Sequence, residues 1–275
     1  MTEKSPCDLY LDLMAAVLTR YGFEGSNVTV KLPTESYPAY LWDMLRGELR
    51  GRPVRLMEQG RFDGAVRAEG RDWPADAETM IGLRRLQNIR RCVESVLEND
   101  VAGDLIETGA WRGGATIYMR AILAAHGVSD RLVWVADSFQ GLPKPDAERY
   151  PDDAGDQHHT RDELAVSEEQ VRQNFRRYGL LDDQVRFLSG WFEETLADAP
   201  IDKLSVLRLD GDMYGSTMVA LQALYDRVSP GGFVIIDDFG AVPACARAVD
   251  DFRTQRAISE PYEKIDWTGV FWRKS

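Results

Sequence analysis

The sequence predicts an α/β fold built on a doubly wound, mostly parallel sheet, and three observations carry this prediction. Short apolar runs alternate with segments of helical periodicity from residue 78 onward, as strands and helices do in such sheets. The run at 233–236 is apolar at every position, as in strands that are buried on both faces. Glycine-rich or acidic residues follow several of the runs, at the place where open α/β sheets bind ligands.

The first 77 residues are predicted to form an N-terminal extension of helix and loop that caps the sheet. Residues 10–21 carry Leu11, Met14, Val17 and Leu18 at helical spacing, which indicates an amphipathic helix. A short segment with two valines follows at 28–31. The stretch 46–71 mixes charged, glycine and apolar residues without a steady period, so we expect a mobile cap or loop there.

The sheet domain is predicted to span residues 78–275. Its first helix follows from apolar residues at helical spacing between Leu83 and Leu97. We then expect strands at 104–107, 132–136, 185–188, 206–209 and 232–236, and helices at 115–125, 216–225 and 242–258. The tail, 262–266 and 270–272 around Thr268 and Gly269, predicts a terminal antiparallel hairpin.

Composition excludes several classes of partner. The chain of 275 residues carries 33 Lys and Arg against 45 Asp and Glu, a formal charge of −12, which repels phosphate backbones and argues against nucleic acid. Three isolated cysteines predict neither a disulfide framework nor a paired-cysteine zinc site. The polar N-terminus lacks a signal-peptide core, and no apolar run approaches the roughly 20 residues of a membrane span. We therefore expect a cytoplasmic protein with no membrane partner.

A nucleoside site is predicted from the residues that follow the first three strands. A loop of glycines begins at Gly109, after Glu107, and leaves helix N–H groups accessible to a ligand. Asp137 follows the second strand, where an acid accepts hydrogen bonds from ribose hydroxyls. Trp191 follows the third and is placed either to contact an adenine face or to pack in the core.

The charge pattern favours S-adenosylmethionine over a dinucleotide. The glycines of the first loop do not have the GxGxxG spacing, and the chain has no GK[ST] phosphate loop. Glu107 would repel a pyrophosphate, whereas it suits the ammonium and sulfonium charges of S-adenosylmethionine.

Four acidic residues follow the last two parallel strands. Asp210 and Asp212 come after one, and Asp237 and Asp238 after the next. Neighbouring strand ends converge in such a sheet, so these carboxylates would repel one another unless a cation joined them. All-oxygen ligation indicates magnesium, and manganese or calcium would suit the same donors. The alternative is an Asp-rich turn that caps the following helix.

Taken together, these segments resemble the macrocin O-methyltransferase (TylF-type) family. The resemblance covers residues from about 10 to the C-terminus and is weakest before residue 78. The segments that carry it occur in the family's order: 80–86, 107–114, 137–143, 190–192, 208–214 and 236–239.

The resemblance implies the class I methyltransferase fold and a metal-dependent transfer of methyl from S-adenosylmethionine to a sugar hydroxyl of a glycosylated natural product, in antibiotic biosynthesis. It implies metal ligation by Asp210, Asp237 and Asp238, with Mg2+ preferred and Mn2+ acceptable, and proton acceptance by Asp212. The residues it assigns to the cofactor are Thr79, Met80, Glu107, Gly109, Ala110, Trp111, Asp137, Ser138, Gly190 and Trp191. The extension 1–77 is expected to bind the acceptor.

Three points are left open by the sequence. His158 and His159 lie in an acid-rich segment, where a solvated loop is expected, and they stay second candidates for the base. A catechol or other phenolic acceptor would chelate a metal in the same way as a sugar diol, and is the alternative substrate class. The identity of the acceptor, the hydroxyl that is methylated and the assembly of the chain, including a homo-oligomer, are not determined.

Overall fold

The computed structural model describes residues 4–23, 27–29, 57–59 and 62–275. Its centre is a seven-stranded sheet with the order β5-β4-β3-β6-β7-β9-β8. Strands β3 to β7 run parallel, whereas β9 pairs antiparallel with both β7 and β8. The bounds are β3 Asp104–Thr108, β4 Val133–Asp137, β5 Val185–Ser189, β6 Leu204–Leu209, β7 Val228–Ile236, β8 Glu263–Lys264 and β9 Val270–Arg273. The predicted doubly wound sheet and terminal hairpin are confirmed.

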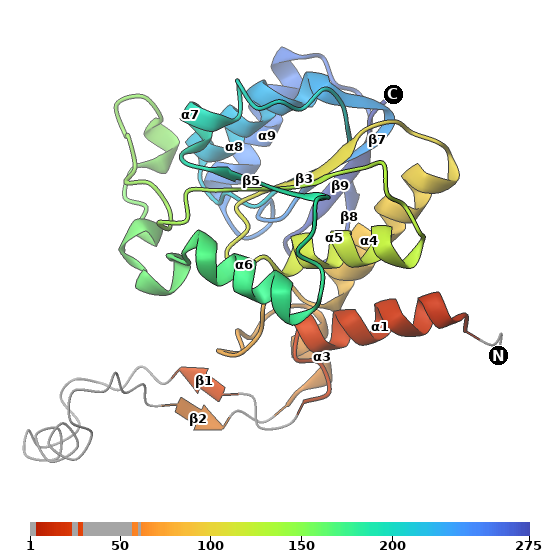
Figure 1. Cartoon of the computed structure of the whole chain (residues 1–275). Coiled ribbons are helices and arrows are strands. Elements are labelled where there is room, and N and C mark those ends of the chain that lie inside the picture. The colour runs from red at the N-terminus through yellow and green to blue at the C-terminus, as the bar shows by residue number, and fades with distance from the viewer. Residues whose placement is uncertain (1–3, 24–26, 30–56, 60–61) are drawn as a thin grey trace, which may run out of the picture.

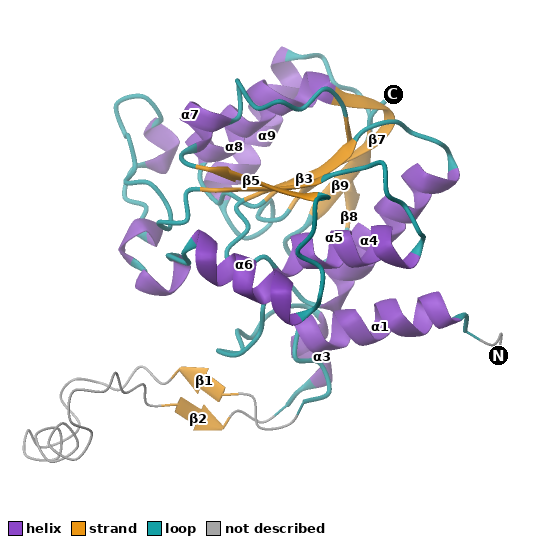
Figure 2. Ribbon diagram, viewed as in Figure 1, coloured by secondary structure: helices purple, strands orange, loops and turns teal. Residues whose placement is uncertain are grey.

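Helices cover both faces of this sheet (Figures 1 and 2). Helices α4 (Leu83–Glu98), α5 (Gly114–Ala125) and α6 (Glu168–Arg177) pack on one face, and α7 (Phe192–Thr195), α8 (Tyr214–Leu224) and α9 (Pro243–Gln255) pack on the other. Side chains of a strand alternate between the two layers. Leu105 of β3 belongs to the first core and its neighbour Ile106 to the second, so both faces of the central strands are buried.

The N-terminal segment packs against the first layer. Helix α1 (Pro6–Leu18) begins at a capping box, in which Ser5 and Asp8 satisfy each other's backbone amides, and it lies against α5. Helix α3 (Gly64–Ala68) is joined to α1 by the buried guanidinium of Arg67, which donates to the carbonyls of Thr19 and Arg20. The expectation of a loop is therefore wrong at residues 64–68. Residues 46–56 and 60–61 lie outside the described part.

The remaining described elements are short. Strands β1 (Asn27–Thr29) and β2 (Met57–Gln59) pair antiparallel and form a small separate sheet. Residues 28–29 of the segment 28–31 therefore lie in a strand, and residues 30–31 lie outside the described part. The expectation of a loop is also wrong at residues 57–59. Four 3-10 turns, η1 (Pro151–Asp153), η2 (His158–Thr160), η3 (Asp162–Leu164) and η4 (Tyr225–Arg227), interrupt the loops. Among the described helices, none is long and apolar enough to cross a membrane.

The change in strand order lies between β3 and β6, the two central neighbours. Gly109 directly follows β3 with a φ of +89°, and a Cβ atom there would collide with the carbonyl oxygen of Asp210. Its missing side chain therefore lets two strand ends approach each other.

We predict that Gly109→Ala lowers the free energy of unfolding by well over 2 kcal/mol. The left-handed backbone alone costs an alanine about 1–2 kcal/mol, and the collision with backbone adds to this cost. Gly127→Ala is the matched control, because Gly127 has a φ of +65° with nothing within 4 Å of its Cβ position. Urea denaturation of both variants measures the difference, and equal losses would contradict the close approach.

Candidate functional site

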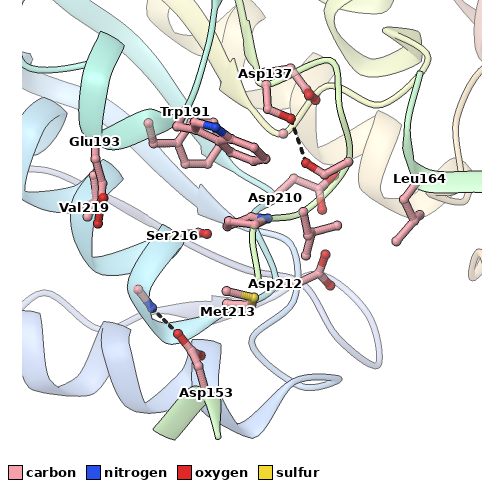
Figure 3. Close-up of a pocket in the computed structure, with 18 of the residues that line it drawn as sticks. Asp137, Asp153, Leu164, Trp191, Glu193, Asp210, Asp212, Met213, Ser216 and Val219 are labelled. Carbon is pink, nitrogen blue, oxygen red and sulfur yellow. Dashed lines mark hydrogen bonds between the residues drawn. The ribbon is translucent and has the colours of Figure 1, made fainter. Parts of the chain in front are cut away.

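Two adjoining cavities open at the carboxyl edge of the parallel strands. The first, of about 320 Å³, is lined by Asp137, Ser138 and Trp191 among others, and Figure 3 shows it. The second, of about 590 Å³, is lined by Glu107 and Asp237 among others. The residues that line both are Met80, Trp111, Asp153, Leu164, Asp210 and Asp212. We call these shared residues the common wall. Because the same residues line both cavities, a group bound in one cavity lies beside a group bound in the other.

The carboxylate of Asp137 organises the loop that follows β3. Its Oδ2 accepts from the amides of Ala110 at 2.7 Å and Trp111 at 3.1 Å, and its Oδ1 accepts from the amide of Phe139 at 2.7 Å. Burial raises the pKa of Asp137, and the three amide donors oppose that shift. Oδ1 therefore keeps a lone pair for a further donor.

The residues assigned to the cofactor divide between the cavities. Met80, Gly109, Trp111, Asp137, Ser138 and Trp191 line the first, whereas Thr79, Met80, Glu107, Ala110 and Trp111 line the second. Gly190 lines neither cavity; it turns the chain with a φ of +142°, close to the side chain of Thr195.

A cluster of carboxylates forms where β6 and β7 end. Asp210, Asp237 and Asp238 each offer an oxygen that lies within 4.8 Å of the other two. Asp237 and Asp238 are buried, and Asp210 is half-buried. The expected convergence of the two strand ends is therefore present.

A buried arginine joins this cluster to β3. Arg208 lies on β6 and is fully buried. It donates to Glu107, to Asp237 and, at 2.8 Å, to Asp210. A second buried arginine, Arg85 of α4, also donates to Asp237. Neither arginine was predicted from the sequence, although an arginine inside the apolar run 206–209 is a signal that could have identified Arg208.

The cluster contains more carboxyl groups than guanidinium groups, so with every group ionised it would hold an excess of negative charge. Of its five carboxylates, Glu107, Asp210 and Asp237 pair with Arg208 or Arg85, and Arg85 also pairs with Asp266 outside the cluster. Within the described residues no cationic side chain forms an ion pair with the other two, Asp212 and Asp238. Burial, reinforced by Asp212 and Asp210, raises the pKa of Asp238 well above its usual value. Burial raises the pKa of Glu107 to about 8, although Arg208 opposes the shift. The Oε2 atom of Glu107 is buried and has no hydrogen-bond partner in the described structure.

Asp212 reaches the common wall through a left-handed turn. Its φ is +56°, and its amide donates to Asp238 Oδ2 at 3.2 Å. Alternate residues of an extended segment point to the same side, so the spacing of Asp210 and Asp212 predicts a shared side. The left-handed turn shows that this prediction is wrong in its geometry. Both residues nevertheless border the same two cavities, and Figure 3 shows them at the first. Burial and then the charge of Asp210 raise the pKa of Asp212 to about 7.

Asp153 is a further buried acid that the sequence analysis did not select. It is 2% exposed and accepts from the amides of Tyr214 at 2.6 Å and Gly215 at 2.9 Å, at the start of α8. A carboxylate at a helix N-terminus is stabilising. This contact holds η1 beside the turn that carries Asp212.

The two histidines are placed differently. His158 lines the second cavity, and its Nδ1 lies 2.6 Å from Asp156 Oδ2. His159 is exposed and lines neither cavity. Of the two, His158 alone borders the site, and it does so from a 3-10 turn where a solvated loop was expected.

An open parallel sheet with an antiparallel hairpin at its edge and ligand cavities at its switch point defines the class I S-adenosylmethionine-dependent methyltransferases. Within this class, residues 7–274 match the family described as Macrocin-O-methyltransferase (TylF). The chain belongs to this family. It is an O-methyltransferase, and S-adenosylmethionine is its methyl donor.

Several curated relatives are similar over nearly their whole length. The 8-demethyl-8-(2,3-dimethoxy-alpha-L-rhamnosyl)-tetracenomycin-C 4'-O-methyltransferase of Streptomyces olivaceus is 50% identical, over 99% of this chain and 95% of the relative. The demethyldecarbamoylnovobiocin O-methyltransferase of Streptomyces niveus is also 50% identical, over 98% and 95%. The mycinamicin III 3''-O-methyltransferase of Micromonospora griseorubida is 44% identical, over 100% of both.

Solved structures agree on the fold. The O-methyltransferase NovP superposes with a TM-score of 0.82 at 49% identity, over 98% of this chain and 99% of NovP. The calicheamicin methyltransferase CalS11 has a TM-score of 0.57 at 17% identity, over 99% and 94%, and shares the architecture alone.

We predict that Arg208→Met lowers the free energy of unfolding by about 3–5 kcal/mol, because it leaves buried carboxylates without their shared partner. Arg149→Met is the control. Arg149 pairs with Glu193 at 2.9 Å, but the side chains are 58% and 50% exposed, so about 0–1 kcal/mol is expected. Chemical denaturation at pH 7 without added metal compares them. A loss as small as that of the control would show that the carboxylates do not depend on Arg208.

Proposed function

We propose that this protein transfers a methyl group from S-adenosylmethionine to a sugar hydroxyl of a glycosylated natural product, with a divalent cation, Mg2+ by preference, held by Asp210, Asp237 and Asp238. The observation that carries the proposal is the convergence of these three carboxylates beside the wall common to both cavities. The named relatives support the substrate class, since one is named for a rhamnosyl tetracenomycin and another for mycinamicin III.

The donor set fits a hard cation. All the ligands are carboxylate oxygens, which Mg2+ and Mn2+ prefer, and the excess negative charge of the cluster is what a divalent ion neutralises. Both oxygens of Asp237 accept from arginine, Oδ2 from Arg85 and Oδ1 from Arg208. Each carboxylate oxygen has a second lone pair, so ligation does not require these pairs to break.

We assign the first cavity to the nucleoside part of the methyl donor. Asp137 keeps acceptor capacity for a ribose hydroxyl, and Trp191 lines the same cavity. Glu107 lies on the other side of the wall with a buried, unpartnered oxygen, which suits the ammonium group of the donor. The methyl group would then face the second cavity, where the acceptor binds.

The acceptor's proton is assigned to Asp212. Its carboxyl group borders both cavities, and burial, the largest cause of its raised pKa, favours proton acceptance. A bound Mg2+ would lower the pKa of a sugar hydroxyl and so reduce what the base must supply. The remaining contribution of the protein is to align the hydroxyl oxygen with the methyl group and to exclude water.

We also propose that the extension 1–77 contributes to acceptor binding. Gly70 and Trp73, which belong to it, line the second cavity. Helix α1 of this extension packs into the same core as α4 and α5.

We predict that Asp238→Asn weakens Mg2+ binding by about 10–100-fold or more, as expected for loss of a metal-site group. Asp238 is the informative ligand, because Asp237→Asn would also unpair Arg85 and Arg208. Because Mn2+ prefers the same oxygen ligands, its binding, followed by electron paramagnetic resonance, measures the affinity of the site for a divalent cation. The control is Asp226→Asn, whose side chain is 68% exposed on the surface.

Chelation tests the same site through turnover. EDTA should abolish methyl transfer and Mg2+ should restore it, while S-adenosylhomocysteine binding persists. Full turnover in excess EDTA would end the metal proposal and leave the methyltransferase assignment intact.

We predict that Asp212→Asn lowers turnover by about 10²–10⁴, the usual contribution of a positioned general base. Asparagine tolerates the left-handed φ of +56° at this position, so the backbone is preserved. The affinities for Mn2+ and S-adenosylhomocysteine should stay within a few fold of wild type. Near-normal turnover would reject Asp212 as the base, and His158→Ala would then be assayed, because His158 lines the second cavity.

A further inference from the structure

Two exposed tryptophans line the second cavity. Trp73, between α3 and α4, is 45% exposed, and Trp267, in the turn of the β8–β9 hairpin, is 39% exposed. Of the large hydrophobic side chains that are exposed within the described residues, these two alone border either cavity; the others are Leu9, Leu13, Phe23 and Tyr262. Large apolar surface at the edge of a cavity is typical of ligand binding.

The protein fixes the ring of Trp267. Its indole N–H donates to the carbonyl of Glu69 at 2.8 Å, and the guanidinium of Arg71 lies 4.7 Å from its ring centroid. The polar atom of the indole is therefore satisfied by the protein, so what the ring offers a ligand is apolar surface. A ring that is already held loses little conformational entropy when a ligand binds.

Trp73 lies beside a cation that borders the same cavity. The guanidinium of Arg161 is 6.0 Å from the Trp73 ring centroid, and Arg161 also lines the second cavity. Trp73 belongs to the N-terminal extension and Trp267 to the C-terminal hairpin. The two indoles thus bring opposite ends of the chain to one cavity.

The two tryptophans are more exposed than the three proposed metal ligands, which line the same cavity. Asp237 is 3% and Asp238 is 9% exposed, so these groups lie at its buried end. If the sugar hydroxyl binds there, as the proposed function requires, the group to which the sugar is attached extends toward solvent and meets the indoles.

We propose that Trp73 and Trp267 bind the apolar aglycone of the glycosylated acceptor, an inference that rests on the proposed function. Each indole offers a flat apolar face against which an aromatic or alicyclic aglycone stacks. Contacts between aromatic faces stabilise a complex beyond the apolar area that they bury. The aglycone contact sets specificity, because a free sugar reaches the carboxylates and gains nothing from the tryptophans.

Calorimetry with two probes tests the proposal in the presence of S-adenosylhomocysteine and Mg2+. Naphthyl α-L-rhamnoside carries an aromatic aglycone, and methyl α-L-rhamnoside carries almost none. Trp73→Ala and Trp267→Ala should each weaken binding of the naphthyl glycoside by about tenfold, since 1.4 kcal/mol is one decade. Binding of the methyl glycoside should change by less than about twofold. Trp73→Phe, which keeps an aromatic ring, should recover most of the affinity.

Leu13→Ala is the matched control, because Leu13 is 62% exposed on α1 and lines neither cavity. The inference is overturned if wild type does not prefer the naphthyl glycoside, if both alanine variants bind it normally, or if they lose both probes equally. Transfer of labelled methyl by wild type reports separately on the proposed function. A protein that shows the tryptophan-dependent preference but methylates neither glycoside would refute rhamnoside methylation and leave the aglycone contact standing.

Discussion

Five carboxylates meet at the ends of β3, β6 and β7, and the buried guanidinium of Arg208 is the group that allows them to do so. Its hydrogen bonds to Glu107, Asp210 and Asp237 join three neighbouring strands at one point. An unpaired carboxylate buried at these strand ends would become protonated or move into solvent. The reason is that burying an isolated charge costs more free energy than folding provides. The five carboxylates outnumber the guanidiniums of Arg208 and Arg85, and this surplus of carboxylate oxygens suits the site for a divalent cation.

The sheet holds this cluster by close approach of backbones. The turn after β3 passes against the Asp210 carbonyl, where only glycine fits. Asp137 then fixes the same loop by accepting from the amides of Ala110 and Trp111. The strand ends and the carboxylate of Asp137 therefore hold this loop, which lines part of the first cavity. No ligand is needed to position it.

Both ends of the chain complete the second cavity. Asp266, in the hairpin turn, organises that turn through Oδ1 and faces Arg85 Nε at 3.0 Å through Oδ2. Thr268 of the same turn donates to the carbonyl of Asp237 at 2.9 Å. From the other end, the segment after α3 meets the hairpin where the carbonyl of Glu69 accepts from Trp267. The C-terminal hairpin lies at the edge of the sheet. It nevertheless supports Asp237, through the carbonyl of that residue and through its partner Arg85.

The sequence by itself determined the order of the parallel strands along the chain, the terminal hairpin and the acids that follow β4, β6 and β7, because periodicity and strand-end position are local properties. It also carried the resemblance that the family match confirms. It did not determine which charges pair: Arg208 and Arg85 reach Asp237 from positions 29 and 152 residues away. It misjudged the geometry at Asp212, where the backbone is left-handed with a φ of +56°. Charge pairing, backbone collisions and the meeting of Trp73 with Trp267 at one cavity depend on distances through space, and only the tertiary structure sets those distances.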